Sequence, residues 1–145
     1  MRNLLVLLVG AITPLCAAGA VEAQQSDIDT GARAEVRLGI EAYLARQVEL
    51  ARTHYERALA IDSMEFEARW RLAEVMLDIG KQTPDSIKNP ARDSLYALAE
   101  RQAQRAVSVA PDSANGYYVL SASIGRTSLT KSKKERVRRA GEIRE

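Results

Sequence analysis

From Ala32 onward, apolar residues along this chain recur at spacings of three and four positions. This is the spacing of amphipathic helices, whereas a half-buried strand would alternate every second residue. The first part of the pattern predicts helices over about 31–46, 49–61 and 65–79. Gly80 follows the third of these and predicts its end, because glycine is favoured just beyond the last turn of a helix.

A polar segment with two prolines, 81–90, follows and predicts a loop. Asn89 and Pro90 predict the cap and first turn of a fourth helix that reaches about Val109, since proline is well tolerated where its missing N–H is not needed. Pro111 ends that helix. Beyond it, the pattern predicts a fifth helix, capped by Asp112 or Ser113 and reaching about Gly125, and a sixth, strongly basic helix over 127–145.

The chain repeats itself. Residues 37–39, Arg-Leu-Gly, recur as Arg-Leu-Ala at 71–73, 34 residues later, and Leu120-Ser121 repeats the element 48 residues after Leu72. The second helices show the same offset of 48: Ala51, Ala58, Leu59 and Ile61 correspond to Ala99, Ala106, Val107 and Val109. Two kinds of helix with one offset indicate a repeat with about 14 inserted residues, which we place at about 81–93.

The small residues in these repeats allow two antiparallel helices to approach closely, and Leu38, Leu72 and Leu120 are expected to fill the space between them. A single helix pair cannot bury its apolar face, so neighbouring pairs stack. The predicted fold class is therefore all-α, with antiparallel helix pairs stacked as a right-handed solenoid over residues 32–145.

The first 23 residues predict a secretory signal peptide. Arg2 provides a positive start, an apolar run from Leu4 to Ile12 follows, and small residues lead to a cut after Ala23, or alternatively after Ala20. The run covers about nine residues, against roughly 20 for a membrane-spanning helix, so no span is expected after cleavage. The polar residues 24–31 predict a disordered start of the mature chain, and the export signal predicts a periplasmic or secreted location.

The single cysteine, Cys16, lies in the segment expected to be removed. A lipid-anchored alternative is disfavoured because Leu15 is bulky where a lipoprotein signal has a small residue. The mature chain would have no thiol, which excludes disulfide scaffolds, zinc ribbons and cysteine nucleophiles. The net charge of +2 gives no indication of nucleic-acid binding.

The sequence contains no recognisable catalytic set. His54 is the only histidine and has no second ligand of the histidine or cysteine type, so we expect no metal and no cofactor. Neither a G-x-S-x-G sequence nor a phosphate-binding glycine loop occurs. We therefore expect no catalytic residues and a protein that is not an enzyme.

These patterns resemble the tetratricopeptide repeat. Leu38-Gly39, Ala51, Tyr55, Ala58 and Ser63 follow the family pattern in the first repeat, with Ser in place of Pro. Leu72-Ala73, Ala99, Ala103, Ala106 and Pro111 follow it in the second, with Ala103 in place of an aromatic residue. Arg46 stands where the family usually has glycine, which predicts a wider turn.

A narrower resemblance covers about residues 32–145. Residues 69–73, the inserted loop, the Ala-rich helix to Pro111, the segment 113–118 with Gly125-Arg126 and the basic end of the chain are similar to the regulator of microtubule dynamics family. In eukaryotes, the resemblance implies work at microtubules and organelle membranes. An exported bacterial-type chain would not meet microtubules, so the resemblance contributes the expected fold and not the partner.

On a stack of this kind, the first helices line a concave groove suited to an extended peptide or a partner helix. The groove residues that we expect to contact a partner are Arg33, Tyr43, Trp70, Glu74, Asp78, Asn115, Tyr118 and Arg126. Trp70 has two interpretations, either as a ligand anchor or as a core residue under the inserted loop or against Tyr96.

The segment 126–145 carries eight Lys or Arg and three Glu, a local charge of +5. Its cations include Lys131, Lys133, Lys134, Arg136, Arg138 and Arg139, which would attract anionic lipid headgroups, nucleic acid or an acidic partner. Val137, Ala140 and Ile143 form a thin apolar stripe, which we expect to dock on the third repeat as its second helix.

The sequence thus predicts a non-catalytic scaffold that binds a protein or peptide in the cell envelope. Alternatives are association with a membrane or envelope surface through the basic helix, and an adaptor like those of the regulator of microtubule dynamics family. About two and a half repeats are present, while three or more are usual. Either the chain is truncated at its C-terminal end, which we favour, or it associates with itself.

Overall fold

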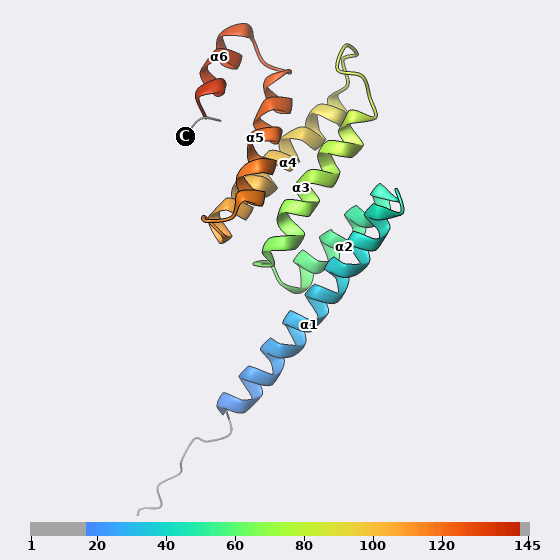
Figure 1. Ribbon diagram of the computed structural model, residues 1–145, viewed down its shortest axis with the longest axis vertical. Coiled ribbons are helices and arrows are strands. Elements are labelled where there is room, and N and C mark those ends of the chain that lie inside the picture. Colours follow the sequence, from blue (N-terminus) through green and yellow to red (C-terminus); the bar gives the residue numbers. More distant parts are fainter. Residues whose placement is uncertain (1–16, 143–145) are drawn as a thin grey trace, which may run out of the picture.

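The computed structural model describes the backbone of residues 17–142 and the side chains of residues 30–141 (Figure 1). These residues form helices and turns without any strand, which confirms the all-α prediction. The helices are α1 (Ala17–Leu44), α2 (Val48–Ile61), α3 (Phe66–Lys81), α4 (Pro90–Val109), α5 (Ala114–Ser128) and α6 (Lys133–Glu142).

The helices pack as pairs, α1 with α2 and α3 with α4, and the pairs stack side by side (Figure 1). The backbone of α3 lies close to both α1 and α5, whereas the backbones of α2 and α4 stay apart over the described residues. The layer of first helices, α1, α3 and α5, is therefore the tighter, inner side of the stack. One apolar core runs through both pairs and includes Tyr55, Leu72, Tyr96 and Val119.

Each pair is closed by a tyrosine ring lying directly on a glycine of the facing helix. Tyr55 of α2 lies on Gly39 of α1, and Tyr96 of α4 lies on Gly80 of α3; both rings are 1% exposed. A Cβ atom at either glycine would fall well inside the ring's van der Waals surface. The absence of that atom is what allows the helices to meet at this distance.

Gly80 is therefore not the helix stop that the sequence predicts. Helix α3 continues to Lys81, Gln82 caps it with helical dihedral angles, and no glycine of the described residues has a positive φ. The second pair has the same close approach at a different place. It lies at Gly80 instead of Ala73 on α3, and at Tyr96 instead of Ala103 on α4, seven residues away in each case. The aromatic residue missing at Ala103 is supplied by Tyr96.

The inserted residues lengthen α3 and α4 as well as the loop between them. The insertion predicted at about 81–93 is therefore wrong in its extent. Helix α3 continues three residues further past Ala73 than α1 does past Gly39, and α4 begins six residues further ahead of Ala99 than α2 does ahead of Ala51. The loop itself is 82–89. It ends where predicted, because the Asn89 side chain accepts a hydrogen bond from the Arg92 N–H at 3.0 Å and Pro90 begins the helix.

The turn between α1 and α2 is tight, contrary to the wider turn predicted from Arg46. Arg46 adopts a left-handed conformation with φ of 63°. The Gln47 N–H bonds to the carbonyl of Ala42 at 2.9 Å, which is the long hydrogen bond of a glycine-type helix end. Arginine thus occupies a glycine conformation, at a cost of about 1–3 kcal/mol.

Three other predictions differ from the structure. Helix α1 includes residues 24–31, for which disorder was predicted; most of the predicted signal peptide, residues 1–16, lies outside the described residues. Leu72 is buried, but Leu38 is 44% exposed and does not fill the space between helices. The sixth helix is shorter than predicted, since α5 extends to Ser128 and α6 begins only at Lys133.

We predict that Gly39→Ala and Gly80→Ala each lower the free energy of unfolding, by about 1–3 kcal/mol or more, because a methyl group displaces a buried tyrosine ring. Gly125→Ala is the matched control. Its Cβ would meet nothing within 4 Å, so alanine in this helix should stabilise by about 0.5–1 kcal/mol. Urea denaturation followed by circular dichroism measures all three. Equal effects at Gly80 and Gly125 would show that the close approach is unimportant.

Candidate interaction face

A hydrogen-bonded group joins α1 to α3 on the inner face. The Tyr43 hydroxyl donates to Oδ2 of Asp78 at 2.6 Å, and Lys81 Nζ donates to the other carboxylate oxygen at 2.9 Å. Burial, followed by the hydrogen bond to the Asp78 carboxylate, raises the pKa of Tyr43 well above its ordinary value. Tyr43 therefore remains a protonated donor at physiological pH and fixes the two helices in register.

Glu74 lies one turn before Asp78 and is half-buried. Its carboxylate forms no hydrogen bond or ion pair with the side chains that the structure describes. Burial raises the pKa of Glu74, and the negative charge of Asp78 raises it further. The charges of Arg71 and Lys81 lower it again in part, but the net pKa lies above its ordinary value, so the ionised carboxylate lowers stability at neutral pH.

Trp70 lies on α3 with one side in the core and the other toward the inner face. It is half-buried and packs against the core cluster. The Arg71 guanidinium lies 4.4 Å from the centre of its ring, and Arg71 Nε donates to Glu67 at 2.8 Å. The packing supports the core interpretation of Trp70, whereas its role as a ligand anchor stays a prediction.

The residues predicted on α5 and α1 are placed less closely together. Tyr118 is 64% exposed, and Asn115 and Arg33 are also exposed. Arg126 donates to Oδ2 of Asp85 at 2.8 Å and thus holds the 82–89 loop against α5. Its charge is directed at the loop, so Arg126 does not belong to a free binding face.

The structure thus brings together four predicted residues, Tyr43, Trp70, Glu74 and Asp78, at the centre of the inner face. A hollow of about 360 Å³ borders Tyr43 and Asp78 where α1 meets α3, and Lys81 and Arg46 also line it. Sequence analysis missed Lys81 and Arg71. Their spacings, Asp78 to Lys81 and Glu67 to Arg71, are those of helical ion pairs and were available as a signal.

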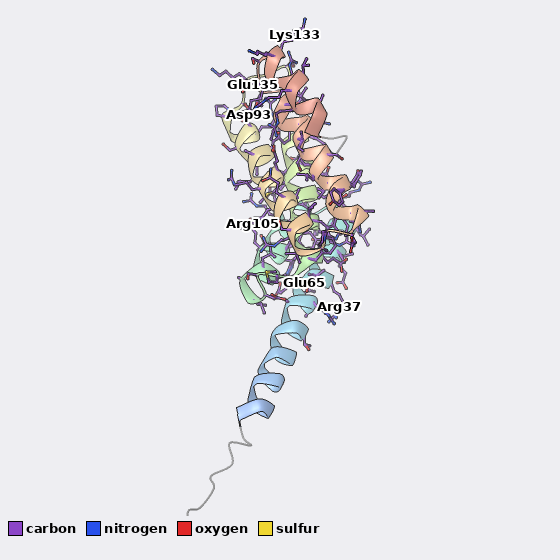
Figure 2. The ribbon with its side chains drawn as sticks, turned by 90° about the vertical axis from the view of Figure 1, so that its left-hand side faces the viewer. Arg37, Glu65, Asp93, Arg105, Lys133 and Glu135 are labelled. Atoms are coloured by element: carbon purple, nitrogen blue, oxygen red, sulfur yellow. The ribbon has the colours of Figure 1, made fainter. Side chains whose placement is uncertain are left out.

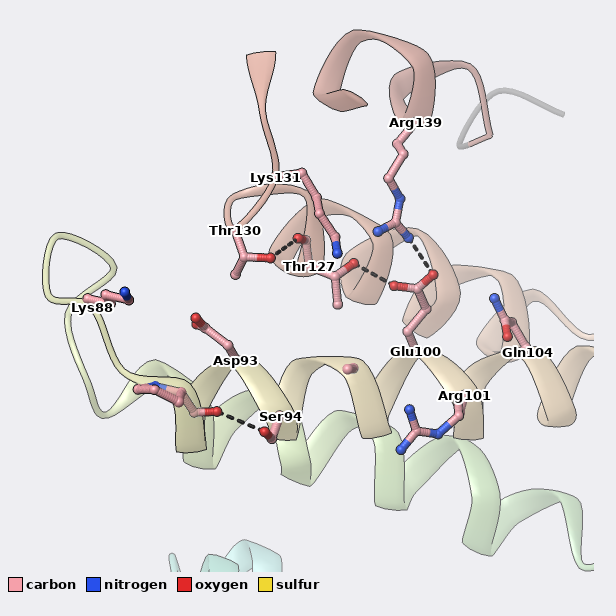
Figure 3. Close-up of a pocket in the computed structure, with 12 residues that line it drawn as sticks. Lys88, Asp93, Ser94, Glu100, Arg101, Gln104, Thr127, Thr130, Lys131 and Arg139 are labelled. Atoms are coloured by element: carbon pink, nitrogen blue, oxygen red, sulfur yellow. Dashed lines mark hydrogen bonds and ion pairs between the residues drawn. The ribbon is translucent and has the colours of Figure 1, made fainter. Parts of the chain in front are cut away.

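A second hollow, of about 620 Å³, lies on the other side of the stack between α4, the end of α5 and α6 (Figure 3). Glu100 of α4 accepts hydrogen bonds there from the Thr127 hydroxyl, at 2.5 Å, and from Arg139. Burial raises the pKa of Glu100, but the bonds from Arg139 and Thr127 and the charges of Arg139 and Lys131 lower it more, so the net pKa lies below its ordinary value.

Helix α6 is held mainly by this ion pair. Ser132 and Glu135 form a reciprocal cap at its start, since the Ser132 N–H donates to the Glu135 carboxylate at 3.3 Å and the Glu135 N–H donates to Ser132 Oγ at 3.4 Å. The predicted docking of an apolar stripe is wrong for the described part, because Val137 is 71% exposed and Ala140 is also exposed. Arg139 is partly buried, whereas the other predicted tail cations are exposed: Lys131, Lys133, Lys134, Arg136 and Arg138.

Charges of both signs cover the body from Arg37 on α1 to Lys133 and Glu135 on α6 (Figure 2). No helix of the described residues is both long enough and apolar enough to cross a membrane. These features define an all-helical stack of pairs with a hydrogen-bonded polar group, Tyr43–Asp78–Lys81, on its inner face.

The family model for regulator of microtubule dynamics protein 1-3 matches residues 39–145, and the chain belongs to this family. The match begins at Gly39, in the second half of α1, and therefore includes both glycine–tyrosine contacts. A search of curated proteins finds no match.

We predict opposite effects on stability from two matched substitutions. Glu74→Gln should raise the free energy of unfolding at neutral pH. The raised pKa of Glu74 means that the folded chain favours the protonated carboxyl group, so ionisation of Glu74 lowers the stability as pH rises above 4.5. Glu100→Gln should lower the free energy of unfolding. The depressed pKa of Glu100 means that the folded chain favours the ionised carboxylate, so Glu100 stabilises the fold above pH 4.5 and this stabilisation is lost as pH falls.

Urea denaturation at neutral pH and near pH 4.5 measures both effects. The gain from Glu74→Gln and the loss from Glu100→Gln should each diminish toward the lower pH. A Glu74→Gln protein less stable than the parent at neutral pH would show that the carboxylate has a stabilising partner.

Proposed function

We propose that this chain is a non-catalytic scaffold of tetratricopeptide-like helix pairs that binds a protein or peptide partner on its inner face in the cell envelope. The observation that carries the proposal is Glu74. Glu74 is half-buried, lies one turn from both Trp70 and Asp78, and bonds to no side chain that the structure describes, so its carboxylate is available to a partner. A cationic or hydrogen-bonding group of a partner would complete its interactions.

The surroundings of Glu74 suit such a partner. Trp70 offers aromatic surface one turn before Glu74, and the side chains of Tyr43, Asp78 and Lys81 form a hydrogen-bonded polar group beside it. The inner face is preorganised, so a bound segment would not have to order it. The absence of catalytic sequence patterns supports binding as the activity, and residues 1–23 support export.

Site-specific photo-crosslinking in living cells tests the proposal. A photoreactive residue at Tyr118 should form a discrete adduct with a partner. The same residue at Arg101, exposed on α4 of the opposite side, is the matched control and should not. Glu74→Lys should abolish the Tyr118 adduct without loss of helix content. Equal adducts at both positions, or none at Tyr118, would contradict binding on the inner face.

The basic helix supports a second candidate, association with an anionic membrane or envelope surface. This candidate is supported by the exposed side chains of α6, where the cations Lys133, Lys134, Arg136 and Arg138 lie beside the exposed Val137. Binding to vesicles of anionic lipid should then fall steeply with salt. Changing these four cations to Gln should remove it, while the inner-face change Glu74→Lys should leave it intact. Binding that survives the four changes would reject this candidate.

A further inference from the structure

The hollow of about 620 Å³ between α4, the end of α5 and α6 is a groove on the outer side of the stack, which we call the outer groove (Figure 3). One flank of α4 forms its floor, from Pro90 to Gln104. The helix advances about 21 Å between these two residues. The outer groove is therefore elongated along α4.

A groove at this place is a regular feature of the stack, because the backbones of successive second helices stay apart over the described residues. A smaller groove, of about 330 Å³, lies between α2 and α4. At the offset of 48, Arg52 and Glu56 of that groove correspond to Glu100 and Gln104 of the outer groove. The smaller groove stays open although α5 and α6 follow it in the chain, so these grooves are not where the next helix pair packs.

The two grooves differ in what lines them. The smaller groove has apolar side chains that include Leu72, Met76 and Leu98. The outer groove is lined mainly by charged and hydroxyl side chains, with the small residues Ser94 and Ala97 in the middle of its floor. Because it offers little apolar surface, we expect a polar occupant.

The acidic side chains of the outer groove are already engaged within the fold. Glu100 accepts hydrogen bonds from Thr127 and Arg139. The Asp93 carboxylate accepts a hydrogen bond from Arg92 Nη2 at 2.8 Å. Both negative charges of the groove are thus compensated by the protein itself.

Three cations of the outer groove lack such a partner. The side chains of Lys88, Arg101 and Lys131 are exposed, and none forms an ion pair or a side-chain hydrogen bond with another residue that the structure describes. In Figure 3, Lys88 lies at one end of the floor, Arg101 lies toward the other end, and Lys131 reaches in from the opposite wall. The outer groove therefore offers three positive charges to a ligand.

We propose that the outer groove binds an extended acidic segment of a partner protein, with carboxylates at Lys88, Lys131 and Arg101. Lys88 precedes Pro90 by two residues, and α4 advances about 16 Å from Pro90 to Arg101. One phosphate or carboxylate group cannot span that length. In an extended chain, side chains on one face repeat about every 6.6 Å, so acidic residues at three alternate positions span about 13 Å and match the row of cations.

Other polyanions fit the outer groove less well. A flat membrane surface cannot enter between α4 and α6, and the described residues that line the groove include no aromatic ring on which the bases of a single-stranded nucleic acid could stack. The outer groove lies on the opposite side of the stack from the inner face. Binding there is therefore independent of the partner proposed for the inner face.

Fluorescence anisotropy with a labelled peptide of alternating Glu and Ser tests the proposal, with the corresponding Gln and Ser peptide as reference. The protein should bind the first peptide and not the second. Arg101→Gln should weaken binding by about tenfold because, with Arg139 bonded to Glu100, Arg101 has the guanidinium that remains to bond a carboxylate bidentately. For the same reason, a photoreactive side chain in place of Arg101 should capture no such segment.

Arg105→Gln is the matched control, since it removes the same charge from an exposed position of α4 outside the groove and should leave binding unchanged. Arg101→Lys, which keeps the charge without the bidentate geometry, should fall between Arg101→Gln and the parent. Equal losses in Arg101→Gln and Arg105→Gln would show attraction to net charge alone and would overturn the proposal. So would equal binding of the two peptides.

Crosslinking then locates the bound peptide. A photoreactive residue at Gln104 should form an adduct with the Glu and Ser peptide, whereas the same residue at Glu56, the equivalent position in the smaller groove, should not. Both positions are exposed, and circular dichroism checks that both proteins fold. Equal adducts at the two positions would overturn the proposal, as would tighter binding of a single-stranded oligonucleotide with the same dependence on Arg101.

Discussion

Two tyrosine rings, each lying on the bare backbone of a glycine, set the geometry of this molecule. Tyr55 on Gly39 and Tyr96 on Gly80 fix how closely the helices of each pair approach and where along their length they meet. The alanines at buried positions, such as Ala51, Ala58, Ala99 and Ala106, fit only because that distance is short. The stacking of pairs and the spacing of the inner face follow from this distance.

Two half-buried glutamates on opposite sides of the stack, Glu74 and Glu100, differ in the partners of their carboxylates. On the inner face, Tyr43 and Asp78 join two helices through a hydrogen bond, while the Glu74 carboxylate beside them bonds to no side chain that the structure describes. On the opposite side, Glu100 is equally a half-buried carboxylate but is fully engaged by Thr127 and Arg139. The same residue type thus lacks a bonded side chain on one side of the stack and joins α4, α5 and α6 on the other.

The sequence alone predicted the features that depend on local chemistry or on periodicity. The cap at Asn89, the helix start at Pro90 and the two offsets were correct because neighbouring residues determine them. Gly80 was misassigned, because a glycine near a helix end serves equally well as a stop or as a close contact. Only the position of Tyr96 on the facing helix decides between them. Leu38 was misassigned because burial depends on what covers a residue, which spacing does not reveal. The inner-face cluster was predicted in position, but the engagement of Arg126 with Asp85 was not, since it depends on the path of a loop.

At the offsets of 34 and 48 residues, the polar pair Glu35–His54 of the first repeat corresponds to Arg69–Gln102 of the second. The first pair joins a carboxylate to an imidazole, whereas the second joins a guanidinium to an amide. Neither member can be exchanged between repeats alone, since Arg at position 35 would face an imidazole and Glu at position 69 would lose the bond to Ser63. At this contact the two repeats are therefore not interchangeable, and each is matched to its own place in the chain.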